Sequence, residues 1–376
     1  MITFKSVTKQ YPDGTVAVDH LNLDVPDGTL TVFVGPSGCG KTTSMRMINR
    51  MIDPTSGALT VNGDDVTKVD PVKLRLGIGY VIQSAGLMPH QRVVDNVATV
   101  PVLKGESRRT ARKAALGVLE RVGLDLKLAN RFPAQLSGGQ QQRVGVARAL
   151  AADPPILLMD EPFSAVDPVV REELQTEILR LQAELHKTIV FVTHDIDEAL
   201  KLGDKVAVFG RGGVLQQYAE PARLLSNPAS DFVAGFVGAD RGYRGLQWRH
   251  STGLRLHDVR SVAESGIDEL RLEPNDWVLI IKPDGTPYGW INAEGVELHR
   301  SGGALYDCTF GGGSLFHPDD SLRQALDSAL SSPSGLGVAV DGDGQPIGGV
   351  RADDVLAALN SQRADALPKL GAPERD

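Results

Sequence analysis

The segment Gly35-Pro36-Ser37-Gly38-Cys39-Gly40-Lys41-Thr42 decides the fold class of this chain. It has the pattern G-x-x-x-x-G-K-[ST] of a phosphate-binding loop, in which the glycines let backbone N–H groups turn toward phosphate oxygens. The apolar run 29–34 before it predicts a buried strand, and residues 43–51 after it predict a helix. A strand, a glycine-rich turn and a helix N-terminus favour a bound anion, so the segment predicts a nucleotide site in an α/β fold.

The side chains of this loop have separate roles in holding a nucleotide. Lys41 would supply a charge to the β- and γ-phosphates, and the hydroxyl of Thr42 would ligate magnesium. The thiol of Cys39 lies close to a helix N-terminus, which can activate it, but a small residue also simply fits there. The candidate nucleotide-binding residues of the loop and the first helical turn are Gly35, Pro36, Ser37, Gly38, Cys39, Gly40, Lys41, Thr42 and Thr43.

Two further apolar runs, 155–159 and 188–193, predict buried strands of the same sheet, and residues 90–150 have a mostly helical pattern. The first run ends at Asp160 and Glu161, where open α/β sheets place ligand chemistry. Asp160 would hold magnesium and Glu161 would polarise an attacking water, although two adjacent carboxylates also suit a helix N-cap. The fold class is therefore α/β, with a helical subdomain at about 88–155.

The segment Leu136-Ser137-Gly138-Gly139-Gln140 opens another helix with small residues and free N–H groups, and so predicts a second anion-binding helix end. A chain with one phosphate loop has no need for both, unless the second caps the nucleotide of a partner subunit. With this segment the sequence resembles the ATP-binding cassette (ABC) ATPases, and the resemblance covers about residues 1–215.

The resemblance implies ATP and Mg²⁺ as ligands, and it implies further site residues in the order usual for this family. Tyr11 would stack on adenine, Gln83 would reach magnesium and the attacking water, and His194 would contact the γ-phosphate. Ser164-Ala165-Val166-Asp167 matches the family's D-loop, with Val166 where leucine is more usual. Two cassettes would pack head to tail as a homodimer. The implied cap on the other subunit's ATP consists of Ser137, Gly139 and Gln140, with Asp167 beside it.

Length and composition exclude several classes of protein. The 376 residues suggest two or three domains, and 41% hydrophobic and 23% charged residues with a mean hydropathy of -0.11 exclude disorder and an integral membrane protein. We expect no secretory signal, and we find no apolar run long enough to span a membrane. Two cysteines make a disulfide framework implausible and fit a reducing compartment, so the default location is the cytosol.

The balance of basic and acidic side chains changes near residue 240. Residues 1–240, the expected ATPase domain, hold 26 basic and 27 acidic side chains, whereas residues 241–376 hold 13 and 20. We expect a linker at 241–252. Beyond it the segments 278–291 and 337–350 share the pattern Asp-Gly-x-Pro-x-Gly at an offset of 59 residues, and each predicts a strand, a turn and a strand. Helices are expected at about 322–330 and 354–359.

This part, 253–376, resembles a degenerate tandem of cystathionine-β-synthase (CBS) modules, at about 254–298 and 314–360, with a disordered tail after about 363. The positions that hold adenosine ligands in such modules are Asn292, Gly295, Arg351 and Asp354 here, so only Asp354 matches the family. An adenine nucleotide, a structural dimerisation role and a sensor of ionic strength all stay open for this part. Its acidic balance motivates the last of these, because salt screens surface charges.

Finer matches resemble the ATPase of importers for glycine betaine, choline, carnitine or proline. They lie at 81–90, 94–101 and 227–241, and a coupling helix of the membrane permease would dock at Leu87, Met88 and Pro89. The expected location is the cytoplasmic face of the membrane, with permease subunits as direct partners and a solute-binding protein as an indirect one. Alternatives are an importer for another small solute and an ABC ATPase acting on nucleic acid. We expect no nucleic acid, because the basic residues at 108–113 have the spacing of a solvated helix face.

Overall fold

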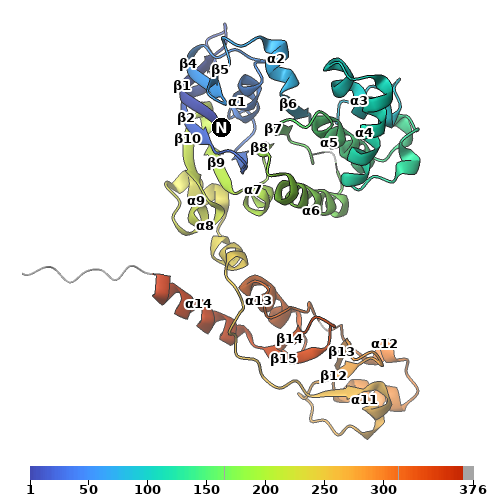
Figure 1. Cartoon of the computed structure of the whole chain (residues 1–376). Helices are drawn as coiled ribbons and strands as arrows, with labels where there is room; N and C mark the ends of the chain where they lie inside the picture. The colour runs from blue at the N-terminus through green and yellow to red at the C-terminus, as the bar shows by residue number, and fades with distance from the viewer. Residues whose placement is uncertain (165, 312, 367–376) are drawn as a thin grey trace, which may run out of the picture. The chain divides into compact units, whose positions relative to one another are not determined.

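The computed structural model describes residues 1–164, 166–311 and 313–366. The chain forms two compact units, one covering Met1–Ala239 and the other beginning at Asp240 (Figure 1). None of the described helices is both long and apolar enough to cross a bilayer.

The first unit is built on a six-stranded sheet with the strand order β10-β9-β3-β8-β7-β6. Neighbouring strands run parallel, except β10, which pairs antiparallel with β9. Every residue of the three central strands is buried, as their unbroken apolar runs predict for a sheet covered on both faces. The strands are β3 (Leu30–Val34), β6 (Ile78–Val81), β7 (Ile156–Asp160), β8 (Thr188–Thr193), β9 (Lys205–Phe209) and β10 (Leu215–Ala219).

A second, antiparallel sheet with the order β2-β1-β4-β5 shares a core with the first. The core packs apolar residues of both sheets around helix α1 (Lys41–Ile48), whose Met45, Met47 and Ile48 are buried. Helix α1 is therefore fixed on both sides, and so is the loop that precedes it. The strands of this sheet are β1 (Ile2–Gln10), β2 (Val16–Val25), β4 (Ser56–Val61) and β5 (Asp64–Asp65).

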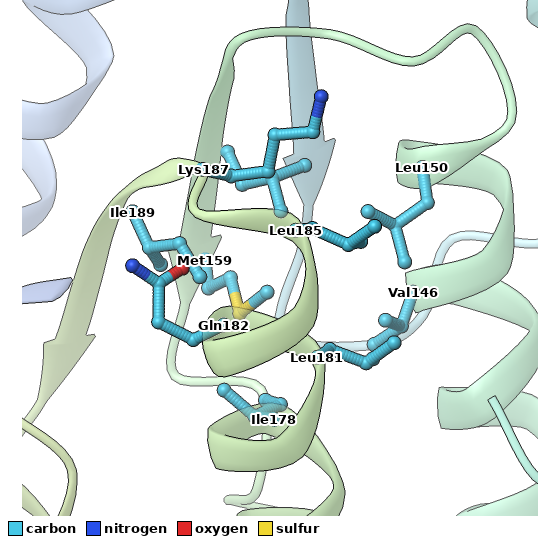
Figure 2. Close-up of a pocket in the computed structure, with 10 residues that line it drawn as sticks. Val146, Leu150, Met159, Ile178, Leu181, Gln182, Leu185, Lys187 and Ile189 are labelled. Carbon is cyan, nitrogen blue, oxygen red and sulfur yellow. The ribbon is translucent and has the colours of Figure 1, made fainter. Parts of the chain in front are cut away.

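Helices α3, α4 and α5 form the predicted helical part of the first unit, which Figure 1 draws in teal and green. Helix α5 leads back to the sheet and packs on α6 (Figure 2). A void of about 10 Å³ between these two helices and the strands β7 and β8 has mostly apolar walls and room for at most about one water, so it is a packing gap and not a ligand site. The helices of this unit are α2 (Pro71–Leu76), α3 (Val93–Leu103), α4 (Arg108–Arg121), α5 (Gly138–Leu150), α6 (Pro168–Leu185), α7 (Ile196–Leu202), α8 (Pro221–Ser226) and α9 (Asp231–Val237).

The second unit contains the predicted repeat as two hairpins with the same register. In the first hairpin Val278 pairs with Ile291 and Ile280 with Gly289; in the second Gly337 pairs with Val350 and Ala339 with Gly348, each 59 residues further on. Leu279 and Trp290 of one hairpin pack in one apolar cluster with Val338 and Val340 of the other. The elements are β11 (Ser261–Ala263), β12 (Val278–Ile281), β13 (Pro287–Ile291), β14 (Gly337–Val340), β15 (Pro346–Val350), α11 (Ala293–Arg300), α12 (Leu305–Cys308), α13 (Leu322–Ser331) and α14 (Ala352–Ala366).

The segment 241–252 is not an extended connection. It holds helix α10 (Arg241–Arg244) and a 3-10 turn (Gly245–Trp248), and Leu246 is buried in the core of the second unit beside Phe316 and Leu322. This segment therefore belongs to the second unit, because burying one leucine fixes it there. Helix α14 continues to Ala366, and the rest of the tail expected to be disordered lies outside the described residues.

Candidate nucleotide-binding site

The phosphate loop joins the end of β3 to the start of α1, as its sequence predicts. Gly40 is the N-cap of α1 with φ +93°, and a Cβ there would lie 2.2 Å from the carbonyl oxygen of Ala17. Only glycine fits such a position without moving the backbone. None of the side chains that the structure describes caps α1, so its first N–H groups stay available to an anion.

The side chain of Lys41 is folded back onto the loop. It is buried, and its Nζ donates to the carbonyl oxygens of Gly35 at 2.7 Å and Pro36 at 2.9 Å. A phosphate can take the place of these carbonyls, since ammonium donors bond to either kind of oxygen. Cys39 lies 3.7 Å from Lys41 Nζ, and burial raises the pKa of its thiol, so at neutral pH it is not a reactive thiolate.

The structure brings two of the three expected magnesium ligands, Thr42 and Asp160, together across 118 residues of chain. The hydroxyl of Thr42 donates to Asp160 Oδ1 at 2.9 Å, and Asp160 is only 6% exposed. One carboxylate and one hydroxyl at the phosphate loop suit Mg²⁺, which takes oxygen ligands and usually shares them with phosphates and water. The donor set therefore fits the metal.

Glu161 and His194 also meet, at the ends of the neighbouring strands β7 and β8. Nδ1 of His194 lies 3.2 Å from Glu161 Oε2, and the Glu161 side chain is one-quarter exposed. Glu161 has φ +44°, a strained conformation for a non-glycine residue, and its N–H donates to the carbonyl of Val192 at 3.0 Å. This backbone bond holds Glu161 at the end of β8, where its carboxylate lies beside the imidazole.

Ser137, Gly139 and Gln140 form a cluster of their own at the N-terminus of α5. The hydroxyl of Ser137 accepts from the N–H of Gln140, and the side-chain carbonyl of Gln140 accepts from the N–H of Ser137. Among the described residues the hydroxyl of Ser137 has no acceptor of its own, so its hydrogen can be donated to an anion. Asp167 caps α6 in the same manner, accepting from the N–H of Val170 at 3.1 Å, and Ala165 before it lies outside the described residues.

The remaining candidates lie at exposed positions near these elements. Tyr11 follows β1, is 36% exposed, and has Lys9 Nζ 5.4 Å from its ring centroid. Gln83 lies two residues after β6 and is exposed, as are Ser37 and Gly38 at the tip of the loop, while Thr43 is half-buried in α1.

Two residues next to the metal ligands have no counterpart among the sequence candidates. Arg46 Nη2 lies 3.6 Å from Asp160 Oδ2, and the Tyr80 hydroxyl donates to the same oxygen at 3.4 Å. Burial raises the pKa of that hydroxyl, which keeps it protonated. The spacing of Thr42 and Arg46, four residues apart on α1, could have placed both on one face of the helix.

Comparisons with known proteins agree with this geometry. The family model described as ABC transporter matches residues 18–164. The osmoprotectant import ATP-binding protein OsmV of Salmonella typhimurium is 40% identical over 96% of this chain and 97% of its own. The carnitine transport ATP-binding protein OpuCA of Listeria monocytogenes is 42% identical over 80% of this chain and 77% of its own.

Among solved structures, the post-hydrolysis dimer of the ATP-binding cassette MJ0796 bound to ADP and Pi is similar, with a TM-score of 0.54 and 35% identity. It covers 59% of this chain and 99% of its own, as expected if the likeness is confined to the ATPase part. A relative matched over nearly the full length of both chains, together with a phosphate loop in its strand–helix setting, leads to one conclusion. The chain belongs to the ABC transporter family of ATP-binding proteins.

Proposed function

We propose that the protein binds and hydrolyses ATP to energise the import of a compatible solute of the glycine betaine, choline, carnitine and proline class. The observation that carries the proposal is the near-complete match to an osmoprotectant import ATP-binding protein, in which both units are covered. The match to the second unit favours an importer subunit over an ATPase of another kind, since the first unit, which holds the ATPase site, ends at Ala239.

In the proposed reaction the protein mainly positions groups and stabilises charge. Lys41 exchanges its two loop carbonyls for phosphate oxygens, and the uncapped N–H groups of α1 bind the same phosphates. Thr42 and Asp160 would hold Mg²⁺, with Gln83 as a further ligand; the ion neutralises charge on the phosphates when bound.

Glu161 accepts a proton from the attacking water, or orients that water, at the γ-phosphate. His194 lies beside the carboxylate and would donate to a phosphate oxygen, so both side chains would act at the γ-phosphate, Glu161 on the water and His194 on the phosphate. Tyr11, exposed after β1, would stack on the adenine.

The active form is proposed to be a homodimer with ATP between the subunits. Ser137, Gly139 and Gln140 of one subunit would cap the γ-phosphate held by Lys41 of the other, and Asp167 would lie beside that contact. Two features support this arrangement. The free hydroxyl hydrogen of Ser137 suits an anion, and a cassette of 35% identity forms dimers with ADP and Pi.

The dimer would work at the cytoplasmic face of the membrane under permease subunits that a solute-binding protein supplies. The permease would dock at Leu87, Met88 and Pro89. This segment lies just after Gln83, and Asn96 anchors it: Met88 N–H donates to Asn96 Oδ1 at 2.7 Å, and Asn96 Nδ2 donates to Met88 O at 3.1 Å. Docking there would therefore place the permease next to Gln83, which is expected to reach the attacking water at the γ-phosphate.

The second unit is proposed to be a regulatory pair of CBS-like modules, supported by its two hairpins of identical register. Asp354, the one residue that matches an adenosine-binding position, already has hydrogen-bond partners within this unit. Its carboxylate contacts His257 Nε2 at 2.8 Å and accepts from the N–H of Arg351 at 3.1 Å. An adenine nucleotide would have to displace these contacts, so dimerisation or a response to ionic strength is the simpler role.

The test is ATP hydrolysis by the complete importer in proteoliposomes, with the binding protein and one candidate solute at a time. The proposal expects a compatible solute to stimulate hydrolysis and expects DNA and RNA to have no effect. Stimulation by nucleic acid, with no response to any solute, would reject the transport function and leave only the ATPase chemistry.

A further inference from the structure

A buried polar cluster lies directly behind His194. Thr193, the last residue of β8, donates from its hydroxyl to Glu198 Oε2 at 2.6 Å, and the same hydroxyl accepts from the N–H of Asp195 at 3.0 Å. Glu198 belongs to α7 and is only 7% exposed. The residues on both sides of His194 are therefore held by one carboxylate and one hydroxyl.

Arg171 of α6 joins this cluster to the loop before α6. Its Nε lies 3.8 Å from Glu198 Oε1, its Nη1 lies 3.9 Å from Asp195 Oδ2, and its Nη2 donates to the carbonyl oxygen of Val166 at 3.3 Å. Val166 precedes Asp167, which caps the same helix. One guanidinium thus contacts both the segment that carries His194 and the segment that carries Asp167.

The side chains of Arg171 and Glu198 lie close together, but the distance between them is too long for a hydrogen bond. Burial raises the pKa of Glu198, and the positive charge of Arg171 opposes that rise. The Nε atom of Arg171 is buried and has no hydrogen-bond partner in the described part of the chain, although Glu198 Oε1 lies less than 1 Å beyond hydrogen-bond distance. A small shift of α6 against α7 would turn this contact into a charge-assisted hydrogen bond, which is a strong one.

We propose that Arg171 and Glu198 are positioning residues that move His194 together with Val166 and Asp167, the end of the loop before α6. The proposal rests on the hydrolytic role of Glu161 and His194 given above. Closure of this pair would fix the imidazole against Glu161 at the moment when the loop meets the partner subunit. Neither residue touches the substrate, so both act on turnover and not on the affinity for ATP.

The experiment measures kcat, the Kd for ATP and the melting temperature of the full-length protein with Arg171→Met, Glu198→Gln and the double variant. We expect kcat to fall about 10- to 100-fold in each single variant, the size of effect that misplacing a catalytic group by about 1 Å can have. The Kd for ATP should stay within about threefold. The double variant should be no slower than the worse single variant, because the two residues act through one contact.

A matched control joins the same two helices. Lys201 of α7 and Glu172 of α6 lie 3.7 Å apart in an exposed pair. Lys201→Met and Glu172→Gln should leave kcat unchanged, since exposed pairs contribute little. Arg171→Lys should recover part of the lost turnover, because a lysine keeps the charge but not the several donors of the guanidinium.

Three results would overturn the proposal. They are an unchanged kcat in Arg171→Met and Glu198→Gln, losses that multiply in the double variant, and an equal loss in the Lys201→Met control. If Arg171→Met does not fold, Glu198→Gln decides alone, since it keeps the volume and an acceptor for Thr193. A Glu161→Gln variant in the same assays distinguishes a failure of the proposed function from a failure of the positioning role. If it hydrolyses ATP normally, the proposed function fails, whereas its inactivity beside a normal Glu198→Gln rejects only the positioning role.

Discussion

Replacing Glu161 by glutamine should lower turnover by at least about two orders of magnitude while leaving the fold and the ATP site intact. The backbone contacts of Glu161 are its N–H to Val192 and its carbonyl, which accepts from Ser164, and glutamine keeps all of them. Glutamine also has the same volume and can still contact His194. We therefore expect the free energy of unfolding to change by less than about 0.5 kcal/mol, or about 1–2 °C in melting temperature.

The catalytic loss is much larger, because an amide cannot accept the proton of the attacking water. A positioned base contributes about 10²- to 10⁴-fold, which is about 2.7–5.5 kcal/mol in the activation free energy. Phosphate release at saturating ATP measures this loss, and size-exclusion chromatography with ATP should show the variant accumulating as a closed dimer. Glu184→Gln makes the same chemical change at an exposed position of α6 and should remain active. Phosphate release within about threefold of wild type would remove Glu161 from its role.

Two further predictions concern the phosphate loop. Gly40→Ala should lower the melting temperature of the nucleotide-free protein more than Gly38→Ala, because both have positive φ but only at Gly40 would a Cβ meet a backbone atom, Ala17 O at 2.2 Å. The left-handed backbone conformation costs an alanine about 1–2 kcal/mol, or about 2–8 °C in melting temperature, in either variant. Only Gly40→Ala has the added clash with Ala17, so equal shifts in the two variants would contradict the close approach of Ala17 to Gly40. Cys39 in a Cys308→Ala background should react slowly with iodoacetamide at about pH 8 and faster as the pH rises past about 9, since burial raises the pKa of its thiol and only the thiolate reacts. A rate that levels off below about pH 8 would show an activated thiol instead.

The sequence predicts the central sheet and the phosphate loop well because both depend on local patterns. The unbroken apolar runs that become β3, β7 and β8 can only be covered on both faces, and a glycine-rich turn before a helix has few alternatives. The repeat in the second unit is predictable for a similar reason, since a hairpin turn fixes the register on both of its sides. The meeting of Thr42 and Asp160 follows from the topology, because carboxyl ends of parallel strands share an edge.

The contacts around His194 could not be predicted in this way. Arg171 and Glu198 look like ordinary surface charges in their helices, and only the packing of α6 on α7 brings them within 3.8 Å and buries the carboxylate. The segment 241–252 suggests a linker from its glycines and charges. A single buried leucine, Leu246, has no periodic pattern that would have shown otherwise.

We expect ATP bound at Lys41 to drive the import of a compatible solute. The most direct measurement is uptake of labelled glycine betaine, choline, carnitine and proline by cells that carry the whole importer, with the wild-type chain and with Lys41→Ala, at low and high external osmolarity. We expect uptake of at least one of these solutes, and we expect this uptake to rise with osmolarity and to be lost in Lys41→Ala. Uptake of none of them by a membrane-bound importer with active ATPase subunits would contradict this expectation.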